Sequence, residues 1–250
     1  MNRPYRWLAH YYDELFQPFR SPIDAARERV PGRILPRVRT ACDLACGTGT
    51  TALMLARQGI RVYAVDLSAP MCKLSREKAQ RACLPVRVLR ADMRSFRLPE
   101  PADLVLCEYD AVNHVPKKAD LQRVAASVQR ALQPGGYFFF DVNNAPGFKR
   151  YWTGTVWVER PGLILMMRTG HRPQLDRAWS DIDLFVREGK HWQRHQERVE
   201  EVCWSSGEIR RIFRDAGFDR LRAWDSAPLW KNPLVREGCR TIYLARKSEG

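Results

Sequence analysis

The sequence predicts an α/β fold in which helices cover both faces of a parallel sheet, and three observations support this prediction. Between about residues 39 and 144, short apolar runs alternate with amphipathic segments. A glycine-rich turn, "DLACGTGT" at 43–50, follows the first apolar run. Acidic residues stand at or near the end of all five apolar runs. This alternation is typical of βαβ units, whose ligands bind at the carboxyl ends of the strands.

The elements of this region are predicted by apolar periodicity and by turn residues. The expected strands are residues 39–46, 60–68, 85–93, 102–110 and 137–143. The expected helices are residues 50–59, 69–82 and 117–136. Gly59 ends the first of these helices, and Pro134-Gly135-Gly136 is expected to end the third, because glycine and proline stop helices.

The pattern changes after Asn144. From about residue 151 to 204, several β-runs are separated by turns at Pro161-Gly162 and Glu188-Gly189, which predicts antiparallel hairpins. A capping box, "SSGE" at 205–208, then predicts a helix over 208–217. Two final strands are expected at about 218–225 and 239–246.

Composition limits the classes of protein that fit. The 250 residues are 45% apolar with a net charge of +14, which fits a folded globular chain. No secretory signal begins the chain, and the longest apolar runs, such as "LILMM", are too short to cross a bilayer. We therefore expect a cytoplasmic protein with no membrane contact. The seven cysteines form no C-x-x-C pair and predict reduced thiols, and His191 and His195 lie in strand-like sequence, so no metal site is expected.

The glycine-rich turn fits two different ligands. Gly47-x-Gly49-x-x-Ala52 satisfies the dinucleotide fingerprint, in which helix amides hold a pyrophosphate. Asp43 precedes the turn and disfavours a pyrophosphate, whereas it suits a cationic ligand with an ammonium and a sulfonium group. Asp66 is placed to accept from ribose hydroxyls in either case, and Asp92 can accept from an adenine amino group beside Met93.

The ordered motifs resemble the class I S-adenosylmethionine-dependent methyltransferases. They are "DLACGTGT" at 43–50, "VYAVDLS" at 62–68, "RADMRSF" at 90–96, "ADLVLCEYDAVNHV" at 102–115 and "LQPGGYFFFDVN" at 132–143. The resemblance implies a Rossmann-like seven-stranded sheet whose last strand is antiparallel, with an antiparallel β insertion. Ala45 stands where that family usually has its first glycine. The hairpins further resemble the small-molecule branch, including sugar-amine N-methyltransferases.

The resemblance also implies a domain organisation and a cofactor site. An N-terminal helical cap would occupy residues 1–36, the Rossmann-like domain 37–150 and 205–250, and the insertion 151–204, as a substrate lid or dimer contact. S-adenosyl-L-methionine would be the cofactor and S-adenosyl-L-homocysteine its product. The implied cofactor residues are Tyr12, Arg20, Asp43, Ala45, Cys46, Gly47, Gly49, Asp66, Leu67, Met71, Ala91, Asp92, Met93 and Glu108.

His114 and Tyr109 are the candidate catalytic residues, because they follow the fourth strand. The unperturbed pKa of histidine, about 6.5, suits a general base, although His114 equally fits a core or capping role. The acceptor is expected to be a small molecule, methylated on nitrogen or oxygen in a monomer or homodimer.

Three alternatives remain open to different degrees. An RNA methyltransferase would suit the basic charge, but the fourth strand lacks an N/D-P-P-Y segment and no RNA-binding module is visible. A member of the fold that binds S-adenosylmethionine without catalysis is also compatible with the sequence. A nicotinamide oxidoreductase is disfavoured, because Tyr243-x-x-x-Lys247 lies in a strand and its groups would stand about 13 Å apart.

Overall fold

Seven strands form one mixed sheet in the order β10-β11-β5-β4-β1-β2-β3. The computed structural model describes residues 5–16, 21–229 and 236–249. The strands are β1 (Thr40–Leu44), β2 (Arg61–Asp66), β3 (Val86–Arg90), β4 (Ala102–Cys107), β5 (Leu132–Asn143), β10 (Phe218–Asp225) and β11 (Arg240–Lys247). The last strand, β11, pairs antiparallel with both β5 and β10, whereas β1 to β5 pair in parallel. The predicted fold class is confirmed.

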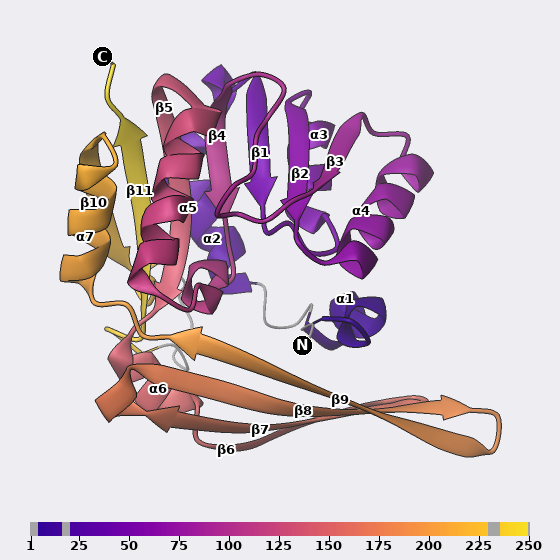
Figure 1. The fold of residues 1–250 in the computed structure, drawn as a ribbon. Coiled ribbons are helices and arrows are strands. Elements are labelled where there is room, and N and C mark those ends of the chain that lie inside the picture. The colour runs from indigo at the N-terminus through magenta and orange to yellow at the C-terminus, as the bar shows by residue number, and fades with distance from the viewer. Residues whose placement is uncertain (1–4, 17–20, 230–235, 250) are drawn as a thin grey trace.

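Helices cover both faces of this sheet (Figure 1). α5 (Lys118–Ala131) and α7 (Ser206–Asp215) contact each other over one face, where Phe138, Phe140 and Phe213 stack. α2 (Ser21–Arg29) and α3 (Thr50–Arg57) pack on the other face, and α4 (Ala69–Arg81) contacts α3. The predicted capping box is present at the start of α7. Both faces are therefore buried, which explains the continuous apolar runs of the central strands.

A second sheet of four antiparallel strands extends from the carboxyl edge of the first (Figure 1). Its strands are β6 (Gly154–Arg160), β7 (Leu163–Arg172), β8 (Arg177–Glu188) and β9 (His191–Val202), and α6 (Ala145–Tyr151) leads into it. One face of this sheet packs against the 3-10 helix η1 (Leu8–Tyr11) and against α1 (Tyr12–Phe16). The helices η1 and α1 thus lie between the two sheets.

The predicted end of the helix over 117–136 is wrong. α5 ends at Ala131, and β5 begins at Leu132, which pairs with Ala102 and has extended backbone angles. Pro134-Gly135-Gly136 therefore lies inside the strand, where the pairing with β4 shifts register, instead of ending the helix. The described residues also form short 3-10 helices, which are η3 (Pro31–Arg33), η4 (Leu35–Arg37), η5 (Ala111–His114) and η6 (Pro173–Leu175). Among the described residues, no helix is long and apolar enough to cross a membrane.

Candidate active site

The glycine-rich loop leaves β1 at the point where the strand order reverses, since β1 pairs with both β2 and β4. Ala45, Gly47 and Gly49 all have positive φ, at 57°, 53° and 81°. A Cβ on Gly49 would lie 2.2 Å from Oγ of Ser75, so α4 leaves no room for a side chain there. A Cβ on Gly47 would meet no heavy atom within 4 Å. The loop thus packs tightly on α4 at Gly49 and leaves its surface open at Gly47.

Two of the predicted cofactor acids orient this loop. Oδ2 of Asp43 accepts from the amide of Ala52 at 2.9 Å, and Oδ2 of Asp66 accepts from the amide of Gly47 at 2.9 Å. Oδ1 of Asp66 accepts from the amide of Ser68 at 2.7 Å. Burial raises the pKa of Asp66 and raises the pKa of Asp43 to about 8, with the nearby Glu108 carboxylate adding to the second shift. Hydrogen bonds across the loop therefore fix both carboxylates.

The remaining predicted residues of this edge surround the same loop. Cys46 donates its amide to the carbonyl of Val65, and Ala91 donates to the carbonyl of Asp66, at 3.0 and 2.9 Å. Leu67 is 61% exposed beside Asp66, whereas Met71 is buried on α4.

Asp92 is not left free at the end of β3, and Met93 beside it packs against the apolar core. The Arg94 guanidinium donates to both carboxylate oxygens, and this hydrogen bonding lowers the pKa of Asp92.

Glu108 lies at the end of β4 in an ion pair that the sequence did not predict. Arg27 of α2, which is 5% exposed, donates to both carboxylate oxygens at 2.6 and 2.7 Å. Oγ1 of Thr51 donates to the same carboxylate at 2.8 Å. Arg27 was missed because it occupies an ordinary helical position with no motif. The geometry assigns Glu108 an anchoring contact with α2.

Tyr12 belongs to a helix that covers the loop. Its ring lies 6.0 Å from that of Tyr5 and 4.9 Å from that of Phe16, measured between centroids. The next residue, Asp13, accepts from Oγ1 of Thr48 at 2.7 Å and pairs with Lys78 of α4. These contacts fix α1 over the glycine-rich loop. Arg20, the other predicted residue of this segment, lies outside the described residues.

The two candidate catalytic residues face different neighbours. Tyr109 has a φ of 58° and donates its hydroxyl to Oδ1 of Asp24 at 2.9 Å, on α2. Burial raises the pKa of Tyr109. Nδ1 of His114 lies 3.3 Å from the carbonyl oxygen of Glu200, and Nε2 lies 3.4 Å from the hydroxyl of Tyr5. Because a carbonyl only accepts, Nδ1 carries the proton and Nε2 accepts from the Tyr5 hydroxyl. Burial lowers the pKa of His114, so its neutral form is favoured.

His114 forms a cluster with two carboxylates that the sequence did not bring together. One ligand atom from each of Asp110, His114 and Glu201 lies within 4.8 Å of the others. Arg240 pairs with Asp110 at 2.9 Å on one side, and Nδ2 of Asn143 donates to Glu201 at 3.4 Å on another. Glu201 comes from β9, so only the tertiary fold places it beside the loop that follows β4.

Residues 41–136 match a family described as "Methyltransferase domain". Over 187 residues, the chain is 30% identical to the cypemycin N-terminal methyltransferase of Streptomyces sp, covering 72% of this chain and 73% of the relative. The chain belongs to the S-adenosylmethionine-dependent methyltransferases. The recognition made from the sequence motifs is thereby confirmed.

Solved structures show the same fold as this methyltransferase. A crystal structure of an S-adenosylmethionine-dependent methyltransferase from Clostridium acetobutylicum ATCC 824 has a TM-score of 0.80 at 23% identity and covers 98% of this chain and 100% of that one. The sugar N-methyltransferase KedS8 from Streptoalloteichus sp ATCC 53650 has a TM-score of 0.73 at 20% identity and covers 100% and 94%. A further structure of this fold, the amino pentose methyltransferase CalS10 from Micromonospora echinaspora, contains bound S-adenosylmethionine, the cofactor predicted from the sequence motifs.

Proposed function

We propose that the methyltransferase methylates a nitrogen atom of a small-molecule amine. The observation that carries this proposal is the cluster of Asp110, His114 and Glu201. Glu201 is 5% exposed, and burial together with the Asp110 charge raises its pKa well above the usual range for a carboxyl. Two carboxylates held this close repel each other unless a proton or a cation joins them. Arg240 already pairs with Asp110, and an ammonium group would supply a second cation and hydrogen-bond donors to the buried Glu201.

Two of the similar proteins act on nitrogen according to their names. One is the N-terminal methyltransferase that modifies cypemycin, and the other is the sugar N-methyltransferase KedS8. The two names give different acceptors, so they support the type of acceptor atom and not a particular molecule.

The residues of the glycine-rich edge fit the cofactor. The backbone at Gly47 has open space above it, which lets a ligand approach the main chain closely. Asp66 keeps further lone pairs for ribose hydroxyls after accepting from Gly47 and Ser68. We infer that these groups, together with Asp43, Tyr12 and the neighbouring predicted residues, hold S-adenosylmethionine. When bound, it supplies a methyl group already activated on a sulfonium sulfur.

The residues of the chain would then align the acceptor and manage its proton. An ammonium has no free electron pair, so the amine must lose a proton before its nitrogen can attack. Nε2 of His114 is the unprotonated ring nitrogen, and the lowered pKa keeps the ring neutral near pH 7. His114 can therefore take the proton by way of the Tyr5 hydroxyl that donates to Nε2, while the Asp110 carboxylate stabilises the resulting imidazolium. Alignment within the closed site supplies most of the remaining acceleration.

Acceptors offered as matched pairs test this function. Each small amine is assayed beside the alcohol of the same skeleton, and formation of S-adenosylhomocysteine is measured. We expect turnover of amines only, and His114→Gln should lower it about 10²- to 10⁴-fold. His191→Gln, at an exposed position of β9, is the control and should leave turnover unchanged. Methylation of the alcohols, or of RNA in preference to any small molecule, would contradict the proposal.

A further inference from the structure

One buried carboxylate holds the N-terminal segment against the second sheet. Glu197 of β9 is 7% exposed. Its Oε2 accepts from the amide of Tyr5 at 2.6 Å, and its Oε1 accepts from the amides of Trp7 and Leu8 at 2.5 and 3.1 Å. Trp7 is the N-cap of η1 and Leu8 its first residue, so their amides have no carbonyl partner within the helix. We call this arrangement the Glu197 clamp.

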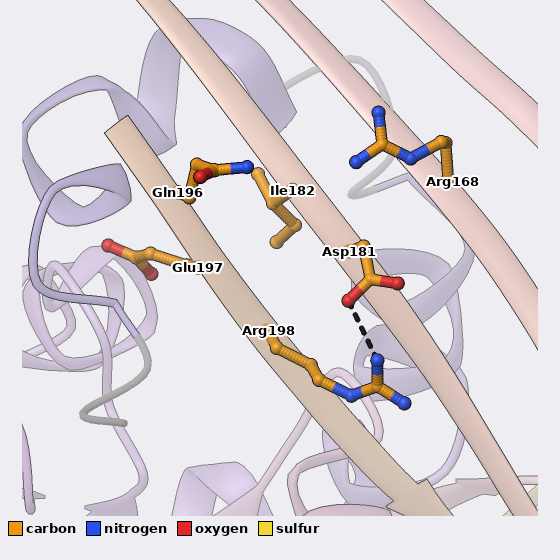
Figure 2. A pocket seen from close by; sticks show the side chains of 6 residues that line it. All are labelled: Arg168, Asp181, Ile182, Gln196, Glu197 and Arg198. Atoms are coloured by element: carbon orange, nitrogen blue, oxygen red, sulfur yellow. Dashed lines mark hydrogen bonds and ion pairs between the residues drawn. The ribbon is translucent and has the colours of Figure 1, made fainter. Parts of the chain in front are cut away.

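The orientation of Glu197 follows from strand alternation. Glu197 pairs with Ile182, and Arg198 pairs with Asp181, so the two positions point to opposite faces of the sheet. Figure 2 shows the Arg198–Asp181 ion pair on one face and the Glu197 side chain directed away from it. On the face of Glu197, the apolar residues Leu163, Leu165 and Leu184 pack with Leu8 and Leu15. The clamp therefore sits inside an apolar contact, where hydrogen bonds to a charged group are strong.

A ring contact supports the clamp next to the carboxylate. Trp7 stacks on His195 with ring centroids 4.1 Å apart and planes 15° from parallel. His195 is two residues before Glu197 on the same strand, so both contacts bind the same short segment to β9.

The clamp sets the position of Tyr5 beside the cluster of Asp110, His114 and Glu201, which we call the reaction site. Tyr5 has a φ of 62°, and its carbonyl accepts from Oγ of Ser68 at 3.5 Å. Its hydroxyl lies 3.4 Å from Nε2 of His114, and its ring lies edge-on to the ring of Tyr12. Tyr5 thus bridges the end of β2, the cover helix α1 and the candidate base.

We propose that Glu197 is a positioning residue for methyl transfer: it closes the N-terminal segment over the reaction site and holds the Tyr5 hydroxyl against His114. Since Nε2 accepts from that hydroxyl, Tyr5 favours the neutral form of His114. The part that concerns catalysis rests on the proposed function, whereas the closure of the segment does not.

The first experiment measures closure without any acceptor. Hydrogen–deuterium exchange of the amides of Tyr5, Trp7 and Leu8 is compared in the wild type, in Glu197→Gln and in the control Glu159→Gln. Glu159 is an exposed acid of β6 on the same sheet, so the control makes the same charge change away from the clamp. We expect roughly 10- to 100-fold faster exchange of these amides in Glu197→Gln only, the loss that corresponds to hydrogen bonds to a charged group. Unchanged exchange would overturn the clamp.

The second experiment measures the consequence for the reaction. We expect Glu197→Gln to lower kcat/KM for the acceptor about tenfold while the Kd for S-adenosylhomocysteine changes less than about threefold. Both Glu197→Gln and Tyr5→Phe should move the acid limb of the pH–rate profile to higher pH, because neutral His114 loses its hydroxyl donor. Faster amide exchange with an unchanged profile would overturn the positioning role. If the wild type turned over no amine, the proposed function would fail while the exchange result still decided closure.

Discussion

The two regions that meet over the reaction site are held together in different ways. On the cofactor side, Asp66 contacts Ser68 and Gly47, which lie 2 and 19 residues away along the chain. On the clamp side, Glu197 contacts Tyr5 and Leu8, which lie 192 and 189 residues away. The cofactor side is thus a local structure built by successive βα turns. The clamp side exists only when residues 5–8 and β9 are both folded and in contact, so we expect it to open first.

The largest expected loss of stability comes from breaking the Arg27–Glu108 ion pair, which joins α2 to the end of β4. Arg27→Met removes the partner of the buried Glu108 and should lower the free energy of unfolding by about 3–5 kcal/mol, because an uncompensated charge stays in the interior. Arg27→Met combined with Glu108→Leu replaces the pair by apolar groups and should recover at least half of that loss. Urea unfolding of the three proteins measures both. If the double variant were less stable than the single variant, the charge explanation would be wrong.

The next expected effect tests the cofactor side directly. Asp66→Ala removes the acceptor of the Gly47 and Ser68 amides and the carboxylate proposed to hold the ribose. We expect the affinity for S-adenosylhomocysteine to fall about a hundredfold or more in calorimetry, with NAD inert for both proteins. Tight binding of NAD to the wild type would contradict the account of this site.

Sequence reasoning succeeded on the cofactor side because its contacts lie within motifs. The spacing of Asp43, Asp66 and the two glycines follows from strand length and turn geometry, so the loop and its acids could be predicted. The partners of Glu108 and His114 could not be predicted, because Arg27, Glu201 and Tyr5 occupy no motif and reach the site only through packing. The boundary at Leu132 was missed because Leu132 pairs with Ala102 of β4. The helix therefore ends before it reaches the Pro-Gly-Gly run that was expected to end it.

Gly47 and Gly49 of the glycine-rich loop should differ in how much stability an alanine substitution costs, because only Gly49 is packed against α4. Gly49→Ala should cost about 2 kcal/mol or more, because a strained φ is combined with a contact to Ser75. Gly47→Ala has open space and should cost only the backbone strain, about 1 kcal/mol. Thermal or urea unfolding of both variants checks the order. Equal losses would show that the packing on α4 does not matter.

The buried carboxyl of Asp43 should also make stability depend on pH. The pKa of Asp43 is about 8 in the folded chain and lies near its ordinary value when unfolded, so the folded state binds the extra proton between about pH 4 and pH 8. Stability from this group is therefore greatest at low pH and is lost as the pH rises through that window. Asp43→Asn keeps an acceptor for Ala52 but has no carboxyl to titrate, so it should lose less stability than the wild type between pH 5 and pH 8. Urea midpoints at the two pH values measure the difference, and parallel losses in both proteins would exclude this cause.

Cofactor binding is proposed to depend on the glycine-rich loop with Asp66, and closure of residues 5–8 over the site on the Glu197 clamp. The two regions are proposed to act independently, and this is the central claim. Calorimetric titration of S-adenosylhomocysteine into the wild type, Asp66→Ala and Glu197→Gln tests it most directly. The claim predicts about a hundredfold or greater loss of affinity for Asp66→Ala and less than about a threefold change for Glu197→Gln. Similar losses in both variants would contradict it, because the two regions would then act as one binding unit.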